Sequence, residues 1–226
     1  MFEYYYNSVP GVGTCRNNLV YTSKIDRQAG LFSIHYTYDQ TYHMNNCLEE
    51  DALARKWKRE LNFTKQMHTA FPHHVLNISS INESKRKIVF NIEGEDFWQM
   101  ANCDEKNYSN VLPDWQEQIL QILKDYRHAN IWKYSLHPSS FFIVKGKLKS
   151  INHFFCYNTI EPHVAITEVL DHISDNRKTK LLQYLKTNNI SPTQKAPWEY
   201  YAQICLDSFK SNYPSSFIEK AKEIYV

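Results

Sequence analysis

The chain has 226 residues, of which 42% are hydrophobic and 15% aromatic, so it can build a sizeable core without disulfides or a structural metal. Twenty-six Lys and Arg residues against 24 Asp and Glu residues give a net charge of +2, which supplies no general electrostatic reason to bind nucleic acid. Only 5 residues are glycine, which disfavours a fold built on several glycine-rich phosphate loops. We therefore expect a folded protein whose partner is not nucleic acid.

Two features concern the cellular compartment. No apolar run approaches the roughly 18–20 residues that a transmembrane helix needs, and Met1–Tyr6 lacks the basic start and apolar stretch of a signal peptide. The 5 cysteines are widely spaced and form no C-x-x-C pair, a pattern typical of reduced thiols. We expect a cytoplasmic protein without a membrane partner, located in the host cytoplasm or the virion if the chain is viral.

The first third of the chain predicts β structure. Residues 18–25 and 31–38 alternate between apolar and polar side chains, as half-buried strands do. The intervening Asp26-Arg27-Gln28-Ala29-Gly30 is typical of a hairpin turn. The two segments are therefore expected to pair as antiparallel neighbours.

A long helix is expected next, from about Leu48 to Ala70. Acidic residues in its first turn suit the positive end of the helix dipole, and Leu53, Trp57 and Leu61 recur every four residues. Two further strands are predicted beyond Pro72; they cover residues 75–81 and 87–92, with a turn at 82–85.

From about residue 95 the pattern becomes mainly helical. Asp114 followed by Glu117 predicts a capping box at the start of an amphipathic helix that reaches Tyr126. Residues 141–144 and 148–151, on either side of Lys145-Gly146, predict a hairpin. Later helices are expected at 163–174, 176–187, 196–211, and from the box Ser216…Glu219 to the end. The fold class is α+β, with a β-rich N-lobe at 1–94 and a helical C-lobe at 95–226.

This order of elements resembles the protein kinase-like fold. The most specific stretches are Leu136-His-Pro-Ser-Ser-Phe-Phe142 and Gly146-Lys-Leu-Lys-Ser-Ile-Asn-His-Phe154. Kinase-like proteins typically have a loop H-x-D-L-x-P-x-N, a short hairpin and then I-D-F-G at these places. Glu60 resembles the helix glutamate that pairs with a strand lysine, and Ile92-Glu93-Gly94 resembles the hinge. The resemblance covers most of the chain and implies a two-lobed domain, with a small antiparallel sheet and one long helix in the N-lobe.

The resemblance fails at the positions that carry the chemistry. Ser135 stands where the family has its catalytic Asp, and a neutral hydroxyl is a poor general base. Ser140 replaces a metal-binding Asn, and Asn152 replaces the Asp that holds magnesium. His35 aligns with the phosphate-binding lysine, although a nearby Glu60 would raise its protonated fraction. Four simultaneous changes indicate that metal-dependent phosphoryl transfer has been lost.

The remaining cleft is expected to be vestigial. The positions that would line a nucleotide in it are Gly11, Gly13, His35, Glu60 and Asn152. Because the acidic ligands are missing, we expect no bound cofactor and no metal, even though ATP or magnesium binding stays conceivable. No histidine group has the paired spacing of a zinc site, and no G-x-S-x-G motif surrounds Ser135 or Ser140.

The sequence thus favours a catalytically inactive, pseudokinase-like protein that binds or scaffolds another protein. Two alternatives stay open. The first is an atypical nucleotide-dependent transferase that uses the same cleft with Asn152, Glu93 or Asp96 recruited. The second is a structural assembly component, for example of a viral particle. Neither the partner's identity nor the oligomeric state follows from the sequence.

Overall fold

The computed structural model describes the following residues: 5–9, 13–17, 22–36, 50–133, 136–153, 156–158, 182–183, 185–187, 189, 206–207 and 209–225. They belong to two compact units. The sheet unit comprises residues 2–102 and 139–154, and the helical unit comprises residues 1, 103–138 and 155–226. The sequence predicted a single boundary between residues 94 and 95. The compact units instead divide after residue 102, and residues 139–154, which were predicted as part of the helical lobe, belong to the sheet unit.

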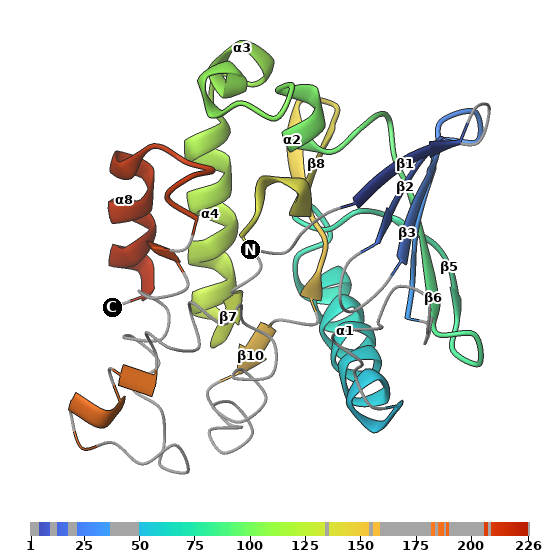
Figure 1. The fold of residues 1–226 in the computed structure, drawn as a ribbon, viewed down its shortest axis with the longest axis horizontal. Coiled ribbons are helices and arrows are strands. Elements are labelled where there is room, and N and C mark those ends of the chain that lie inside the picture. Colours follow the sequence, from blue (N-terminus) through green and yellow to red (C-terminus); the bar gives the residue numbers. More distant parts are fainter. Residues whose placement is uncertain are drawn as a thin grey trace. The chain divides into compact units, whose positions relative to one another are not determined.

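The sheet unit contains a six-stranded antiparallel sheet and one long helix (Figure 1). Its strands are β1 Tyr5–Val9, β2 Gly13–Asn17, β3 Thr22–Asp26, β4 Leu31–His35, β5 Ile78–Asn82 and β6 Lys87–Asn91. Their order in the sheet is β1-β2-β3-β4-β6-β5, so that β5 is an edge strand. Helix α1, Glu50–Ala70, connects β4 to β5. The predicted long helix and small antiparallel sheet are confirmed; strands β1 and β2 were not individually predicted.

The inner face of the sheet packs toward α1. Along β4 the buried positions alternate, and Phe32 and Ile34 lie on the same face as Tyr36. Tyr36 contacts Trp57 of α1, with their ring centroids 5.6 Å apart. Leu53, Trp57 and Leu61, the predicted stripe of α1, are all buried. Hydrophobic burial on this face therefore determines which side chains of each strand lie on the outer face of the sheet.

Two hairpin turns match their predicted positions. The β3–β4 turn contains Gly30 at φ +63°, and a Cβ added there would lie 3.2 Å from the backbone oxygen of Ile92. This turn therefore requires glycine for both its backbone conformation and its close approach to the next segment. The second hairpin joins β8, Phe141–Val144, to β9, Lys147–Ser150. Its two turn residues, Lys145 and Gly146, both have positive φ, as a tight two-residue hairpin requires.

Short elements complete the description of both units. In the sheet unit these are α2 Phe97–Met100 and the 3-10 turn η2 Pro138–Ser140, whose first residue lies at the unit boundary. In the helical unit they are η1 Glu105–Asn107, α3 Tyr108–Val111, β7 Ile131–Lys133 and β10 Cys156–Asn158, of which β7 and β10 pair antiparallel.

The helical unit is built around α4, Trp115–His128, and α8, Ser215–Tyr225, which lie side by side (Figure 1). An aromatic cluster joins them: Trp115 stacks on Tyr213 at 5.8 Å and contacts Phe217 at 5.0 Å. Tyr108 meets the edge of Trp115 at 5.0 Å. All four rings are at most 2% exposed, so apolar burial holds this unit together.

Some sequence predictions need correction or fall outside the described residues. The Asp114 side chain makes no cap to the helix backbone; it accepts a hydrogen bond from the Gln118 side chain instead. Only residues 182–183 and 185–187 of the predicted helix at 176–187 are described as helical, and only 206–207 of the one at 196–211. The predicted helix at 163–174 lies outside the described residues. No helix among the described residues is long and apolar enough to cross a bilayer.

Candidate functional site

The candidate site residues that the structure describes lie in the sheet unit. Glu60 is on α1, His35 ends β4, Ser140 ends η2, Asn152 follows β9, and Gly13 starts β2. Gly11 and Ser135 lie outside the described residues.

Ser140 and Asn152 meet directly. The Asn152 amide Nδ2 donates a hydrogen bond of 2.7 Å to the Ser140 hydroxyl, and the backbone nitrogen of Ile151 donates one of 2.9 Å to the Ser140 carbonyl. Both side chains are buried, with 1% and 3% of their surface exposed. Asn152 has a φ of 63°, in the left-handed region that asparagine tolerates better than most other residues. The two residues are thus held together by backbone and side-chain contacts.

This pair does not fit a magnesium ion. Magnesium takes oxygen ligands, usually with one or two carboxylates among them. Ser140 and Asn152 provide no carboxylate, and Asn152 directs an N–H group, which cannot ligate a cation, at the one hydroxyl beside it. The buried carboxylate of Glu60 already accepts hydrogen bonds at both of its oxygens. No metal-dependent step follows from these residues.

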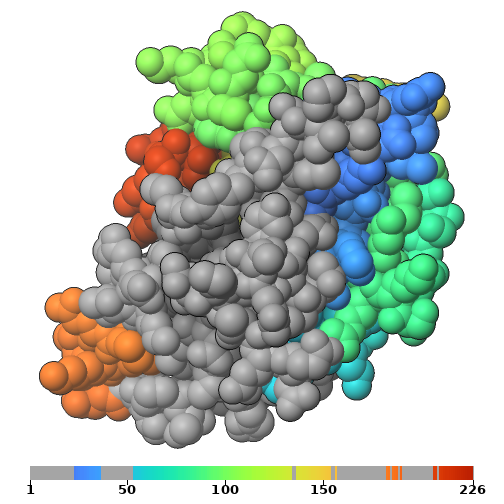
Figure 2. Space-filling model, turned by 45° about the vertical axis from the view of Figure 1, so that its right-hand side comes forward, coloured from blue at the N-terminus to red at the C-terminus, as the bar shows by residue number. Residues whose placement is uncertain are grey.

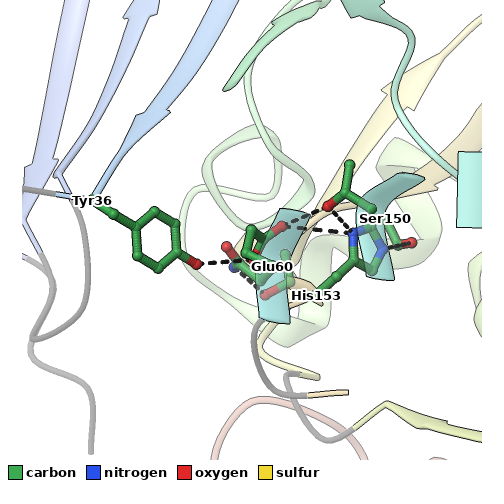
Figure 3. A network of polar contacts seen from close by, with 7 residues as sticks. Tyr36, Glu60, Ser150 and His153 are labelled. Carbon is green, nitrogen blue, oxygen red and sulfur yellow. Dashed lines mark hydrogen bonds and ion pairs between the residues drawn. The ribbon is translucent and has the colours of Figure 1, made fainter. Parts of the chain in front are cut away.

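Glu60 is the centre of a buried polar network that connects α1, the end of β4 and the segment after β9 (Figure 3). The Tyr36 hydroxyl donates to Oε2 at 3.0 Å, and the Thr64 hydroxyl donates to Oε1 at 2.8 Å. His153 Nδ1 lies 2.9 Å from the Thr64 oxygen and 3.7 Å from Glu60 Oε1. Its Nε2 lies 3.3 Å from the Ser150 hydroxyl. Every one of these side chains is at most 1% exposed, so their polar groups depend on one another.

The network constrains the histidine. A threonine hydroxyl carries one proton, and that of Thr64 is donated to Glu60. The contact between Thr64 and His153 must then use a proton on His153 Nδ1. In the neutral ring, Nε2 is left as the acceptor for Ser150. The geometry therefore selects the Nδ1–H tautomer of His153 and supplies Glu60 with donors from both sides.

Ser150, His153 and Glu60 also have the connectivity of a nucleophile, a base and an orienting acid. They cannot attack a substrate in this arrangement, because all three are 0% exposed. In addition, Thr64 bridges the histidine and the acid, which are 3.7 Å apart. The network is therefore a structural connection between α1 and the β8–β9 hairpin.

His35 does not have the predicted relation to Glu60. Tyr36, the next residue, bonds Glu60 on the inner face, and His35 is on the opposite face because neighbouring residues of a strand alternate. The pKa of His35 is lowered, first by burial and then by the charge of Lys87, although a hydrogen bond with the Lys85 backbone acts in the opposite direction. The expectation that Glu60 raises the protonated fraction of His35 is therefore wrong.

Glu93 and Asp96, the acids considered for a recruited active site, have structural partners. Glu93 Oε2 accepts a hydrogen bond of 3.0 Å from the backbone nitrogen of Lys145 in the β8–β9 turn. Asp96 Oδ1 accepts one of 3.2 Å from the backbone nitrogen of Gln99 and so caps α2. Both acids fasten the segment after β6 within the sheet unit.

In the helical unit, the segment that resembles the catalytic loop is held by residues near the C-terminus. The Tyr213 hydroxyl donates to the Leu136 carbonyl at 2.7 Å, and the Tyr225 hydroxyl donates to the carbonyl of Lys133. Asn212 Nδ2 lies 3.4 Å from Nε2 of the half-buried His137. Polar contacts thus fix both flanks of residues 134–135.

Sequence reasoning missed Tyr36, Thr64, Ser150 and His153 as members of one network. Thr64 lies four residues after Glu60, so the helix period could have placed it beside Glu60. The contact between Thr64 and His153 spans 89 positions in sequence, and no local pattern reports such a distance.

No protein-family model matches the chain, and no curated protein matches it. Among solved structures it is similar to WbdD, crystallised with the kinase inhibitor LY294002, at a TM-score of 0.46 and 9% sequence identity. The match covers 99% of this chain and 45% of that chain, so this chain spans less than half the length of that protein. The strands and helices of the chain itself show an α+β fold with a small antiparallel sheet.

Proposed function

We propose that this chain is a catalytically inactive, pseudokinase-like protein that acts by binding another protein. The observation that carries the loss of catalysis in this proposal is the hydrogen bond between Asn152 and Ser140. In the family that the sequence resembles, these two positions hold metal. Here a neutral amide donates to a neutral hydroxyl, and the pair supplies no negative charge to a cation.

The surroundings of Glu60 support the same proposal. Where the kinase-like resemblance implies that this glutamate pairs with a lysine, it accepts hydrogen bonds from the hydroxyls of Tyr36 and Thr64. Its charge is thereby used to join α1 to neighbouring segments of the sheet unit. The Ser140–Asn152 pair and Glu60 thus each have a structural role that does not require phosphotransfer chemistry.

The proposal is tested by thermal unfolding of the full chain with ATP and magnesium, together with transfer of labelled phosphate to a broad mixture of substrates. We expect no saturable stabilisation and no label transfer. A ligand at about 100 times its dissociation constant would stabilise the fold by about 2.7 kcal/mol, so binding would be visible. Saturable stabilisation and label transfer that Asn152→Ala abolishes would contradict the proposal and favour a nucleotide-dependent transferase.

The matched control is Asn91→Ala, at an exposed position of β6 in the same compact unit. It should leave every signal of the wild-type chain unchanged. Light scattering after size exclusion addresses the assembly alternative separately. A large homo-oligomer that joins no other protein would contradict binding to a different protein as the main role.

A further inference from the structure

The outer face of the sheet carries a cationic surface at one end. Because side chains alternate along a strand, Lys24 of β3, His35 of β4 and Lys87 of β6 share this face, opposite the buried positions. His35 is directly opposite Lys87 in the strand register, and Lys85 lies two residues before Lys87, in the β5–β6 turn. We call Lys24, Lys85 and Lys87, with His35 among them, the basic face. Figure 2 shows the surface where the atoms of β3 and β4, in blue, adjoin those of β5 and β6, in green.

The described acids near the basic face make contacts with other groups. Among the described residues, no ion pair involves the ammonium groups of Lys24, Lys85 or Lys87. Glu83, in the same turn, is bound to Lys65 at 2.8 Å. Asp26 is two residues after Lys24 on the same face, and its Oδ1 accepts a hydrogen bond of 2.9 Å from the backbone nitrogen of Ala29. The lowered pKa of His35, caused by burial and then by Lys87 and Lys85, is consistent with a positive potential here.

An edge strand borders this face. β5 pairs with β6 on one side, and within the described residues no strand pairs with its other side. Ser79, Ser80 and Asn82 of β5 are exposed, and the strand contains neither proline nor lysine, the residues that commonly block edge pairing. A free edge of this kind can accept an extended segment as an additional strand.

We propose that β5 and the basic face together bind an extended acidic segment of a partner protein, which adds to the sheet beside β5. The proposal deepens the proposed function, because it names the surface and the chemical class of the protein partner. The backbone of the segment pairs with β5. Alternate side chains of such a strand point to one face, where carboxylates at every second residue meet Lys85 and Lys87.

A nucleic acid fits the same surface less well. A duplex-binding protein neutralises about 6–10 phosphates, whereas the basic face has three lysines whose charge no described acid pairs with. The only large hydrophobic side chains exposed in the described residues are Met100 and Leu182, neither of them aromatic and neither on this face. The side chains that the structure describes here therefore offer no exposed aromatic platform on which bases could stack.

The probe is a fluorescein-labelled peptide of about ten residues that alternates glutamate and threonine, titrated with the full chain by fluorescence anisotropy at about 0.1 M salt. We expect saturable binding that Lys85→Glu/Lys87→Glu weakens about tenfold or more, because two attractive contacts become repulsive. Lys58→Glu/Lys147→Glu is the matched control, since it makes the same charge change at two exposed positions of the same compact unit and should leave binding unchanged. Lys85→Gln/Lys87→Gln removes the same two charges without reversing them and should also weaken binding. Thermal unfolding of each variant checks that it is folded.

Two further probes separate the partner classes. An acidic peptide of equal charge with proline at alternate positions cannot pair as a strand and should bind at least about fivefold more weakly. Equal binding of the two peptides, no binding of either, or equal weakening by the control variant would overturn the proposal. Tighter binding of a short DNA duplex would overturn it in favour of a nucleic-acid surface. Because the proposed function is tested by ATP and label transfer, phosphotransfer activity with intact peptide binding would refute that function and leave this surface standing.

Discussion

Inside each compact unit, a different kind of buried interaction is prominent. The sheet unit contains a buried network of Glu60, Tyr36, Thr64, His153 and Ser150, whose polar groups satisfy one another. The helical unit contains a buried cluster of aromatic rings around Trp115. Hydrogen bonds demand particular partners at particular distances, whereas apolar burial depends mainly on volume and area. The comparison indicates that the sheet unit adds a network of exact polar pairings to its apolar core, whereas the described core of the helical unit consists mainly of packed rings.

The largest expected effect is on the aromatic cluster. Trp115→Ala removes a ring that is 2% exposed and should lower the free energy of unfolding by about 3–5 kcal/mol. Denaturant titration followed by circular dichroism measures this change. Leu182→Ala, at an exposed residue of the same unit, should change stability by less than about 0.5 kcal/mol. Equal effects of the two variants would show that the cluster does not stabilise the helical unit.

The next largest effect is expected when Glu60, at the centre of the network in the sheet unit, loses its charge but keeps its size. Glu60→Gln weakens the hydrogen bonds from Tyr36 and Thr64 and should cost about 1.5–3 kcal/mol of unfolding free energy. Glu83→Gln alters an exposed ion pair with Lys65 and should cost less than about 1 kcal/mol. If Glu60→Gln proved as mild as Glu83→Gln, buried pairing would not be what specifies the sheet unit.

A smaller effect is expected where the helical unit does use hydrogen bonds. Tyr213→Phe and Tyr225→Phe each remove a bond to a loop carbonyl and should cost about 0.5–1.5 kcal/mol. Hydrogen exchange in peptides covering residues 131–137 should become faster. Gln121→Ala is the control, since it removes a hydrogen bond to Asp125 at an exposed position of α4 and not one to this loop. Similar acceleration in all three variants would mean that the tyrosines stabilise the unit generally without holding the loop.

The smallest expected effect is on how the stability of the fold depends on pH in the acidic range. Burial raises the pKa of Asp207, but hydrogen bonds and charge from Lys222 and Lys210 outweigh it, so the pKa lies below its ordinary value overall. A lowered pKa stabilises the fold above the ordinary value near 4, and this contribution is lost as the pH falls through the folded-state pKa. Asp207 is 41% exposed, so solvent limits the contribution to less than about 1 kcal/mol. Asp207→Asn should therefore reduce the loss of stability between about pH 6 and about pH 3, as measured by urea titration. An unchanged slope would contradict the role given to this ion pair.

The local structure could be predicted from sequence where the signal is local. The hairpin at Gly30, the hairpin at Lys145-Gly146 and the helix that begins at Glu50 each follow from turn chemistry or periodicity. The site was harder to predict because a one-residue difference reverses the face of a strand. His35 was assigned the relation to Glu60 that Tyr36 holds. The partner of Thr64, His153, depends on tertiary packing that no local pattern reveals.

The central proposal is that Ser140 and Asn152, which are hydrogen-bonded to each other, do not hold a metal–nucleotide complex. Its most direct test is a titration of Mn²⁺ and ATP into the full chain, followed by electron paramagnetic resonance of the manganese ion. The account predicts the spectrum of Mn²⁺–ATP in solution at every protein concentration. An immobilised manganese signal of one ion per chain that disappears in Asn152→Ala and persists in Asn91→Ala would contradict it.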